Sequence, residues 1–241
     1  MGSVLLEDFI KSTGERTPGQ GVFELEREHL LGVNLRGVVW TRMGSMAAYT
    51  GNIRFTREGT LEHGLGKMVK ISMGGEGVSL IKAEGVGKLY LADKGKKVSV
   101  LKLEKDSICV NFNDILAIED SINWDIRMMR KFSGVMESDI YNVKLEGTGI
   151  IAITTHHEPL TFRVTRERPI FTDPNTTVAW TGSLEPEVKS DLSLKTSVGR
   201  STGESVQMIF RGEGFVVVQP YEEINSQTQT GKRVSNVSVY T

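Results

Sequence analysis

The sequence predicts an all-β protein built from three internal copies of about 65 residues. Three observations support this prediction. Short runs rich in β-branched and aromatic residues are bounded by turn residues, 26 glycines punctuate the chain, and two short motifs alternate three times. With 241 residues and 39 % apolar side chains, the chain is long enough to bury a core without disulfides or metals.

The first motif is a Gly-x-Gly between two β-type runs. It occurs at 85–87, 147–149 and 212–214, so that its first glycines are 62 and 65 residues apart. Glycine inside a strand marks a bulge, a sharp bend or the close approach of another backbone. We therefore expect a long strand to turn a corner at each copy.

The second motif, named here the alanine box, has alanine three residues before Gly or Asp and five before an apolar residue. It occupies 48–53, 117–122 and 179–184. Gly and Asp tolerate the left-handed backbone of a tight connection better than most residues. We expect the three copies to surround a pseudo-three-fold axis or to stack along one.

The alternating motifs divide the chain into segments. We predict an N-terminal extension (1–20), one β domain (21–222) and a polar C-terminal tail (223–241). Within the domain, the repeats are expected at about 33–95, 96–158 and 159–222.

Strand signals cover most of the domain. The predicted strands are 33–40, 77–82, 88–91, 98–103, 141–145, 149–154, 160–164, 206–210 and 215–219. The charged segment 92–97 predicts a hairpin tip. Helix is expected only at 4–11 and, as one amphipathic turn, within 124–132.

Three segments resemble a known family. They are Met43-Gly44-Ser45-Met46-Ala47-Ala48-Tyr49-Thr50-Gly51, Ile115-Leu116-Ala117-Ile118 and Ile209-Phe210-Arg211-Gly212-Glu213-Gly214. They are similar to the family named for altered inheritance of mitochondria protein 24, over roughly residues 20–222. The resemblance implies a TRAP-like fold, the double-stranded β-helix-like sandwich of the tryptophan RNA-binding attenuation protein, and assembly into trimers or rings. Mitochondrial members are linked to inner-membrane organisation, and the family supplies no catalytic residue to transfer.

The start of the chain lacks the basic region of a signal or transit peptide, and acidic residues come early. No uncharged apolar run approaches the length of a membrane span. We therefore expect a soluble cytoplasmic protein that is not transmembrane.

The charge balance argues against a nucleic-acid binder, because 29 Lys and Arg face 30 Asp and Glu. Basic residues still cluster locally, at Lys94, Lys96 and Lys97, at Arg127, Arg130 and Lys131, and at Arg163, Arg166 and Arg168. Gathered on one rim, they would bind RNA, phosphate or acidic lipid head groups. We favour solvated strand edges and turn tips that discourage edge-to-edge pairing.

Residues with catalytic or metal-binding chemistry are few. Cys109 lies in an apolar run and predicts a small buried side chain in a reducing compartment. In a strand, His156 and His157 would point to opposite faces, so with Glu158 they do not predict a shared metal site. The other histidines are His29 and His63.

Two further motifs favour structure over chemistry. The segment after Gly87 continues as a strand, whereas a dinucleotide fingerprint needs a helix start there. The three tryptophans, Trp40, Trp124 and Trp180, are predicted to be core or interface anchors.

The sequence thus predicts a non-enzymatic binding or scaffolding protein that self-associates, with an unknown protein or membrane-surface partner. We assign it no catalytic residue, no metal site and no cofactor. Two alternatives stay open. One is a cupin-like metal-dependent enzyme or small-molecule-binding protein that uses His156 or His157 with carboxylates from another strand. The other is an RNA-binding module, by analogy of fold with the attenuation protein.

Overall fold

Strands dominate the structure, as the β-branched runs predict. The computed structural model describes residues 3–17, 19–57, 80–129, 140–190 and 206–221. Within them lie one α-helix, α1 (Leu6–Thr13), and one 3-10 turn, η1 (Phe112–Asp114). The strands are β1 (Phe23–Arg27), β2 (Leu30–Arg42), β3 (Met46–Thr56), β4 (Leu80–Leu91), β5 (Lys97–Asn111), β6 (Ile115–Glu119), β7 (Asn123–Met129), β8 (Ile140–Thr155), β9 (Leu160–Val164), β10 (Ile170–Thr172), β11 (Thr177–Thr181), β12 (Glu187–Ser190), β13 (Val206–Phe210) and β14 (Gly214–Val218).

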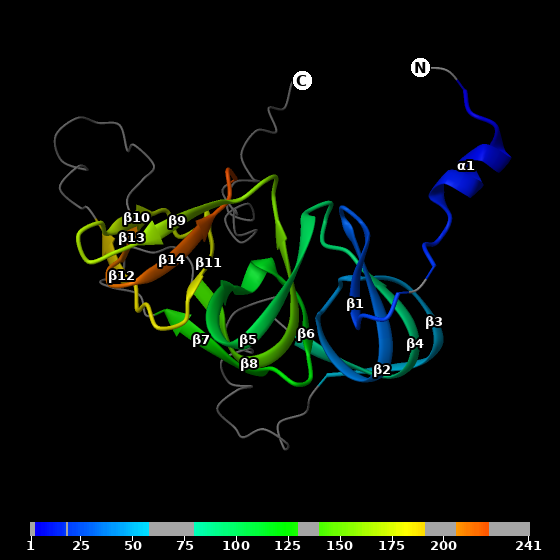
Figure 1. Cartoon of the computed structure of the whole chain (residues 1–241), viewed down its shortest axis with the longest axis horizontal. Helices are drawn as coiled ribbons and strands as arrows, with labels where there is room; N and C mark the ends of the chain where they lie inside the picture. The colour runs from blue at the N-terminus through cyan, green and yellow to red at the C-terminus, as the bar shows by residue number, and fades with distance from the viewer. Residues whose placement is uncertain (1–2, 18, 58–79, 130–139, 191–205, 222–241) are drawn as a thin grey trace, which may run out of the picture.

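All strand pairs in the described residues are antiparallel. The larger sheet has the order β3-β4-β2-β6-β8-β5-β11-β14-β9, with β1 also on β2 and β7 also on β8. A smaller sheet has the order β10-β13-β12. In Figure 1 the strands fall into three groups along the long axis: a first set (β1–β4), a second set (β5–β8) and a third set (β9–β14).

Most predicted elements are confirmed, and two are wrong. A strand, β7, occupies the position of the possible helix at 124–132, because Trp124 and Ile126 alternate with polar residues at the strand period and Ile126 is buried. Residues 130–132, like 77–79 of one predicted strand, lie outside the described residues. The segment 92–97 is a turn, but β4 and β5 on either side of it do not pair with each other.

Three apolar clusters form the core, one centred on each strand set. Each takes side chains from a neighbouring set. The second-set cluster includes Trp40 of β2, the first-set cluster includes Leu116 of β6, and the third-set cluster includes Cys109 of β5. Because burial of apolar area stabilises these clusters, their shared members couple the sets energetically.

The alanine boxes pair with the Gly-x-Gly motifs in the same register three times. Each box alanine lies opposite the residue three positions after the second glycine, and a bulge precedes each alanine. The pairs are Ala48 with Tyr90, Ala117 with Ala152, and Ala179 with Val217. The two motifs found in the sequence therefore meet in space, across β3 and β4, β6 and β8, and β11 and β14.

The glycines of the motif have two separate roles. The first glycine has a positive φ in every copy, 142° at Gly85, 126° at Gly147 and 113° at Gly212, and a side chain there would be strained. At the second glycine there is no room for a side chain. A Cβ on Gly87 would lie 2.0 Å from the carbonyl oxygen of Thr50 in the facing box.

A buried charge cluster joins the first and second strand sets. It consists of Arg42, Asp93, Lys96, Asp114 and Thr154. The Lys96 ammonium donates to Asp114 (3.0 Å), while Asp93 accepts from Arg42 (2.8 Å) and from the Thr154 hydroxyl (3.1 Å). Lys96 and Asp114 are 3 % and 0 % exposed, so these charges persist only because they are paired.

The segment before β1 is fastened by two carboxylates. Glu26 accepts from the backbone N–H of Arg16 (2.6 Å) and from the ammonium of Lys88 (3.2 Å). Glu24 accepts likewise from the N–H of Gly19 (2.9 Å). Burial alone would raise the pKa of Glu26, but the N–H of Arg16 and the charge of Lys88 outweigh it, so its pKa is lowered.

We expect Gly87→Ala to destabilise the fold by about 2–3 kcal/mol, because the new methyl group overpacks the box backbone. The matched control is Gly32→Ala in β2, whose Cβ would meet its neighbours at 3.5 Å, an ordinary contact. Denaturant unfolding measures both. Equal losses in the two variants would contradict the steric role of Gly87.

Asp114→Ala should lower the free energy of unfolding by about 3–5 kcal/mol, because it leaves the buried Lys96 ammonium without this carboxylate. The double variant Lys96→Met/Asp114→Leu removes both charges and should lose less. Lys102→Ala, in an exposed pair with Glu104, should be unchanged within error. If the double variant lost as much free energy of unfolding as the two single variants added together, the result would argue against this pairing.

The stability of the fold should depend on Glu26 in acid. A carboxyl whose pKa is lower in the folded chain stabilises above its ordinary value of 4.5 and loses that contribution as the pH falls below it. Stability should thus fall less steeply for Glu26→Gln than for the unaltered chain as the pH is lowered from about 7 to about 3. Glu167→Gln, at an exposed carboxylate, serves as the control, and an identical slope for Glu26→Gln would contradict the expectation.

Candidate interaction surface

The outer edge of β3 is the most distinctive exposed feature of the described residues. β3 ends the strand order of the larger sheet and, among the described residues, pairs only with β4. Its first seven residues, 46–52, are all exposed, including Met46 (45 %) and Tyr49 (46 %). Such an edge presents unpaired backbone N–H and C=O groups beside apolar side chains, and natural proteins usually protect it.

The strand β10 of the third set also has an open edge. β10 ends the order of the smaller sheet and pairs with β13 alone in the described part of the chain. Ile170 and Thr172 are buried, whereas Phe171 between them is 54 % exposed. Figure 1 shows β10 and β3 at opposite ends of the molecule.

The helix α1 exposes a third apolar surface. None of its residues is buried, and Leu6, Phe9 and Ile10 are more than half exposed. Glu7 and Asp8 in its first turn suit the helix dipole. In Figure 1 it lies apart from the strands, connected to β1 by the segment that Glu24 and Glu26 fasten.

The structure separates the histidines. β8 ends at Thr155, so His156 and His157 lie in the turn after it and not on a strand. His156 stacks on Tyr221 (3.8 Å between ring centroids), whereas His157 is exposed with a φ of 62°. His29 is exposed in the turn after β1, and His63 lies outside the described residues. In the part of the chain that the structure describes, no three His, Cys, Asp or Glu side chains group as a metal site requires.

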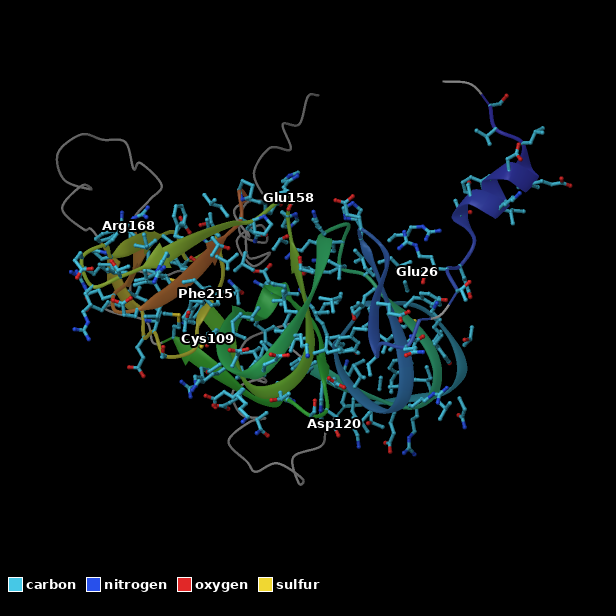
Figure 2. All side chains as sticks on the ribbon, viewed as in Figure 1. Glu26, Cys109, Asp120, Glu158, Arg168 and Phe215 are labelled. Atoms are coloured by element: carbon cyan, nitrogen blue, oxygen red, sulfur yellow. The ribbon has the colours of Figure 1, made fainter. Side chains whose placement is uncertain are left out.

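The basic residues do not form one patch within the described residues. Arg127 lies on β7, and Lys94 lies in the turn between β4 and β5. Arg168 lies between β9 and β10, at the left of Figure 2. Lys96 is not solvated, contrary to expectation, because it belongs to the buried charge cluster. Arg130 and Lys131 lie outside the described residues.

Cys109 and the tryptophans are structural, as predicted. Cys109 packs inside the third-set cluster, and burial raises the pKa of its thiol to about 11, which favours the neutral thiol over the reactive thiolate. Trp40 and Trp180 are buried, at 6 % and 3 % exposed. Trp124 packs edge-on against Trp40, with 5.1 Å between ring centroids.

Sequence reasoning did not find the open edges of β3 and β10. It treated segment 48–53 as a turn motif, although the same motif in β6 and β11 is paired on both sides. The available signal was composition, because Met46, Ala47, Ala48 and Tyr49 form an apolar run with no charge to protect an edge.

The comparisons with known proteins concern most of the chain. A crystal structure of protein SPYM3_0169 from Streptococcus pyogenes is similar in fold, with a TM-score of 0.65 and 23 % sequence identity. The match covers 84 % of this chain and 94 % of that one, and at this identity it establishes the fold alone. No curated protein matches the chain. None of the helices in the described residues has the length and apolar character to span a bilayer.

A family model described as mitochondrial biogenesis AIM24 matches residues 23–221 and thereby confirms the family resemblance that segments 43–51, 115–118 and 209–214 carry. The chain belongs to the mitochondrial biogenesis AIM24 family.

Proposed function

We propose that this chain is a non-enzymatic scaffolding protein that self-associates through the edges of its sheets. The observation that carries the proposal is the unprotected edge of β3, where seven consecutive exposed residues include two large apolar side chains. An exposed apolar edge is a template for pairing with another chain, and a specific partner strand would cover it.

The proposal includes a division of the chain into three β units, at about 33–95, 96–158 and 159–222, with the TRAP-like architecture that the family resemblance implies. The common register of the alanine boxes supports it, as do the three apolar clusters. The paired strands β2 and β4, and likewise β5 and β8, form long two-stranded ribbons bent at a positive-φ glycine.

A partner protein or membrane surface, together with a cytoplasmic location, stays a prediction. The exposed apolar residues of α1 are compatible with contact to either kind of partner. For the metal-dependent and RNA-binding alternatives, the described residues offer no grouped ligands and no single basic rim, so no observation favours them.

Native mass spectrometry at rising protein concentration tests self-association. The expected masses are whole multiples of 26.7 kDa, and a lone 26.7 kDa species at every concentration would overturn the proposal.

Substituting one edge residue should weaken the association. Tyr49→Lys puts a charge on the β3 edge, which protects natural edge strands, and should shift the distribution toward the monomer. Val86→Lys is the matched control, because Val86 is 64 % exposed on β4, away from the open edge. If only Val86→Lys dissociates the protein, the sheet face and not the edge is the contact.

A further inference from the structure

Neighbouring strand sets are joined by one repeated pairing. The box strand of each later set pairs with the first long strand of the set before it. The pairing of β6 with β2 matches Ala117 with Thr41 and Ile118 with Trp40. The pairing of β11 with β5 follows the same pattern, with Ala179 opposite Val110 and Trp180 opposite Cys109.

The partners of the box alanines occupy equivalent positions. Thr41 lies opposite Ile81, four residues before Gly85, and Val110 lies opposite Val143, four residues before Gly147. In the third set, the residue four positions before Gly212 is Met208. It lies opposite Thr172 of β10. β10 is thus the equivalent of the paired segments of β2 and β5, but no box strand covers it in the described residues.

The box strand of the first set, β3, lacks the corresponding partner among the described residues. β3 carries the first alanine box, yet no strand of a preceding set lies beside it among the described residues. Because β3 and β10 lie at opposite ends of the molecule (Figure 1), they cannot meet within one chain.

We infer that β3 of one chain pairs antiparallel with β10 of a second copy. This inference rests on the proposed self-association and names the surface that mediates it. The repeated register places Ala48 opposite Thr172, Tyr49 opposite Phe171, and Thr50 opposite Ile170.

Burial of side chains supports this register. At the central pair of the two internal junctions, Trp40 and Ile118 are 6 % and 0 % exposed, and Cys109 is 5 % exposed. At the corresponding free positions, Tyr49 and Phe171 are 46 % and 54 % exposed. Pairing would cover both rings with each other, and aromatic cross-strand pairs are among those that stabilise antiparallel sheets.

The two surfaces are different, so the contact is head to tail. Each copy offers one β3 edge and one β10 edge, and both are used only when copies form a closed ring or an open chain. The same type of junction that connects the sets within the chain would then connect one chain to the next.

Disulfide crosslinking between two single-cysteine variants tests the register. Tyr49→Cys and Phe171→Cys are each made in a Cys109→Ser background and mixed under mild oxidation. Directly opposed strand residues have Cα atoms within disulfide range, so the mixture should shift from 26.7 kDa to twice that mass on a non-reducing gel. Leu160→Cys, at an exposed position on β9, replaces Phe171→Cys in the matched control and should not crosslink.

The outcomes separate this inference from the proposed self-association. Crosslinking in the mixture, but not in either variant alone, supports the inferred pairing. Crosslinking of Tyr49→Cys with itself would overturn it in favour of two β3 edges in contact, while self-association stands. If native mass spectrometry finds oligomers but no mixture crosslinks, the surface is wrong. If it finds monomers alone, both proposals fail.

Discussion

The close approach of each alanine box to a Gly-x-Gly motif is the constraint on which the architecture depends. At Gly87 the facing carbonyl oxygen of Thr50 would lie 2.0 Å from any Cβ, and at Gly149 and Gly214 side-chain oxygens of the facing box segment lie almost as near. At Gly87 the neighbour is backbone, so this contact leaves no room for a side chain. The same register of the box alanine, with the bulge before it, accompanies this contact in all three copies.

That register has consequences at the ends of the molecule. Inside the chain, each later box strand finds a partner on both sides, and its central residues are buried. The first box strand and β10 are left with one partner each in the described residues, and their central aromatic side chains are exposed. An arrangement that joins strand sets by edge pairing and does not close on itself therefore exposes the groups suited to further pairing. The buried charge cluster stabilises the internal junction at the turn between β4 and β5.

Individual residues show how far prediction from the sequence reached. Strands 160–164 and 206–210 were predicted to the residue, and Cys109 was correctly placed in the core, because β-branched runs and apolar context are local signals. Segment 123–129 was misassigned in part as a helix because Met128 and the basic residues masked a strand alternation of Trp124 and Ile126. Lys96 was expected in solvent, since nothing nearby in sequence reveals its partner Asp114.

The strand content, the two alternating motifs with their spacing, and the family resemblance were all predictable from the sequence. These depend on local conformational preference and on glycines whose backbone no other residue can adopt. Only the structure shows that the boxes contact the Gly-x-Gly motifs, that Lys96 and Asp114 pair in the interior, and that β3 and β10 each have one partner strand among the described residues. Those features join residues far apart in the sequence, so their energies depend on which strands become neighbours and not on the composition of any one segment.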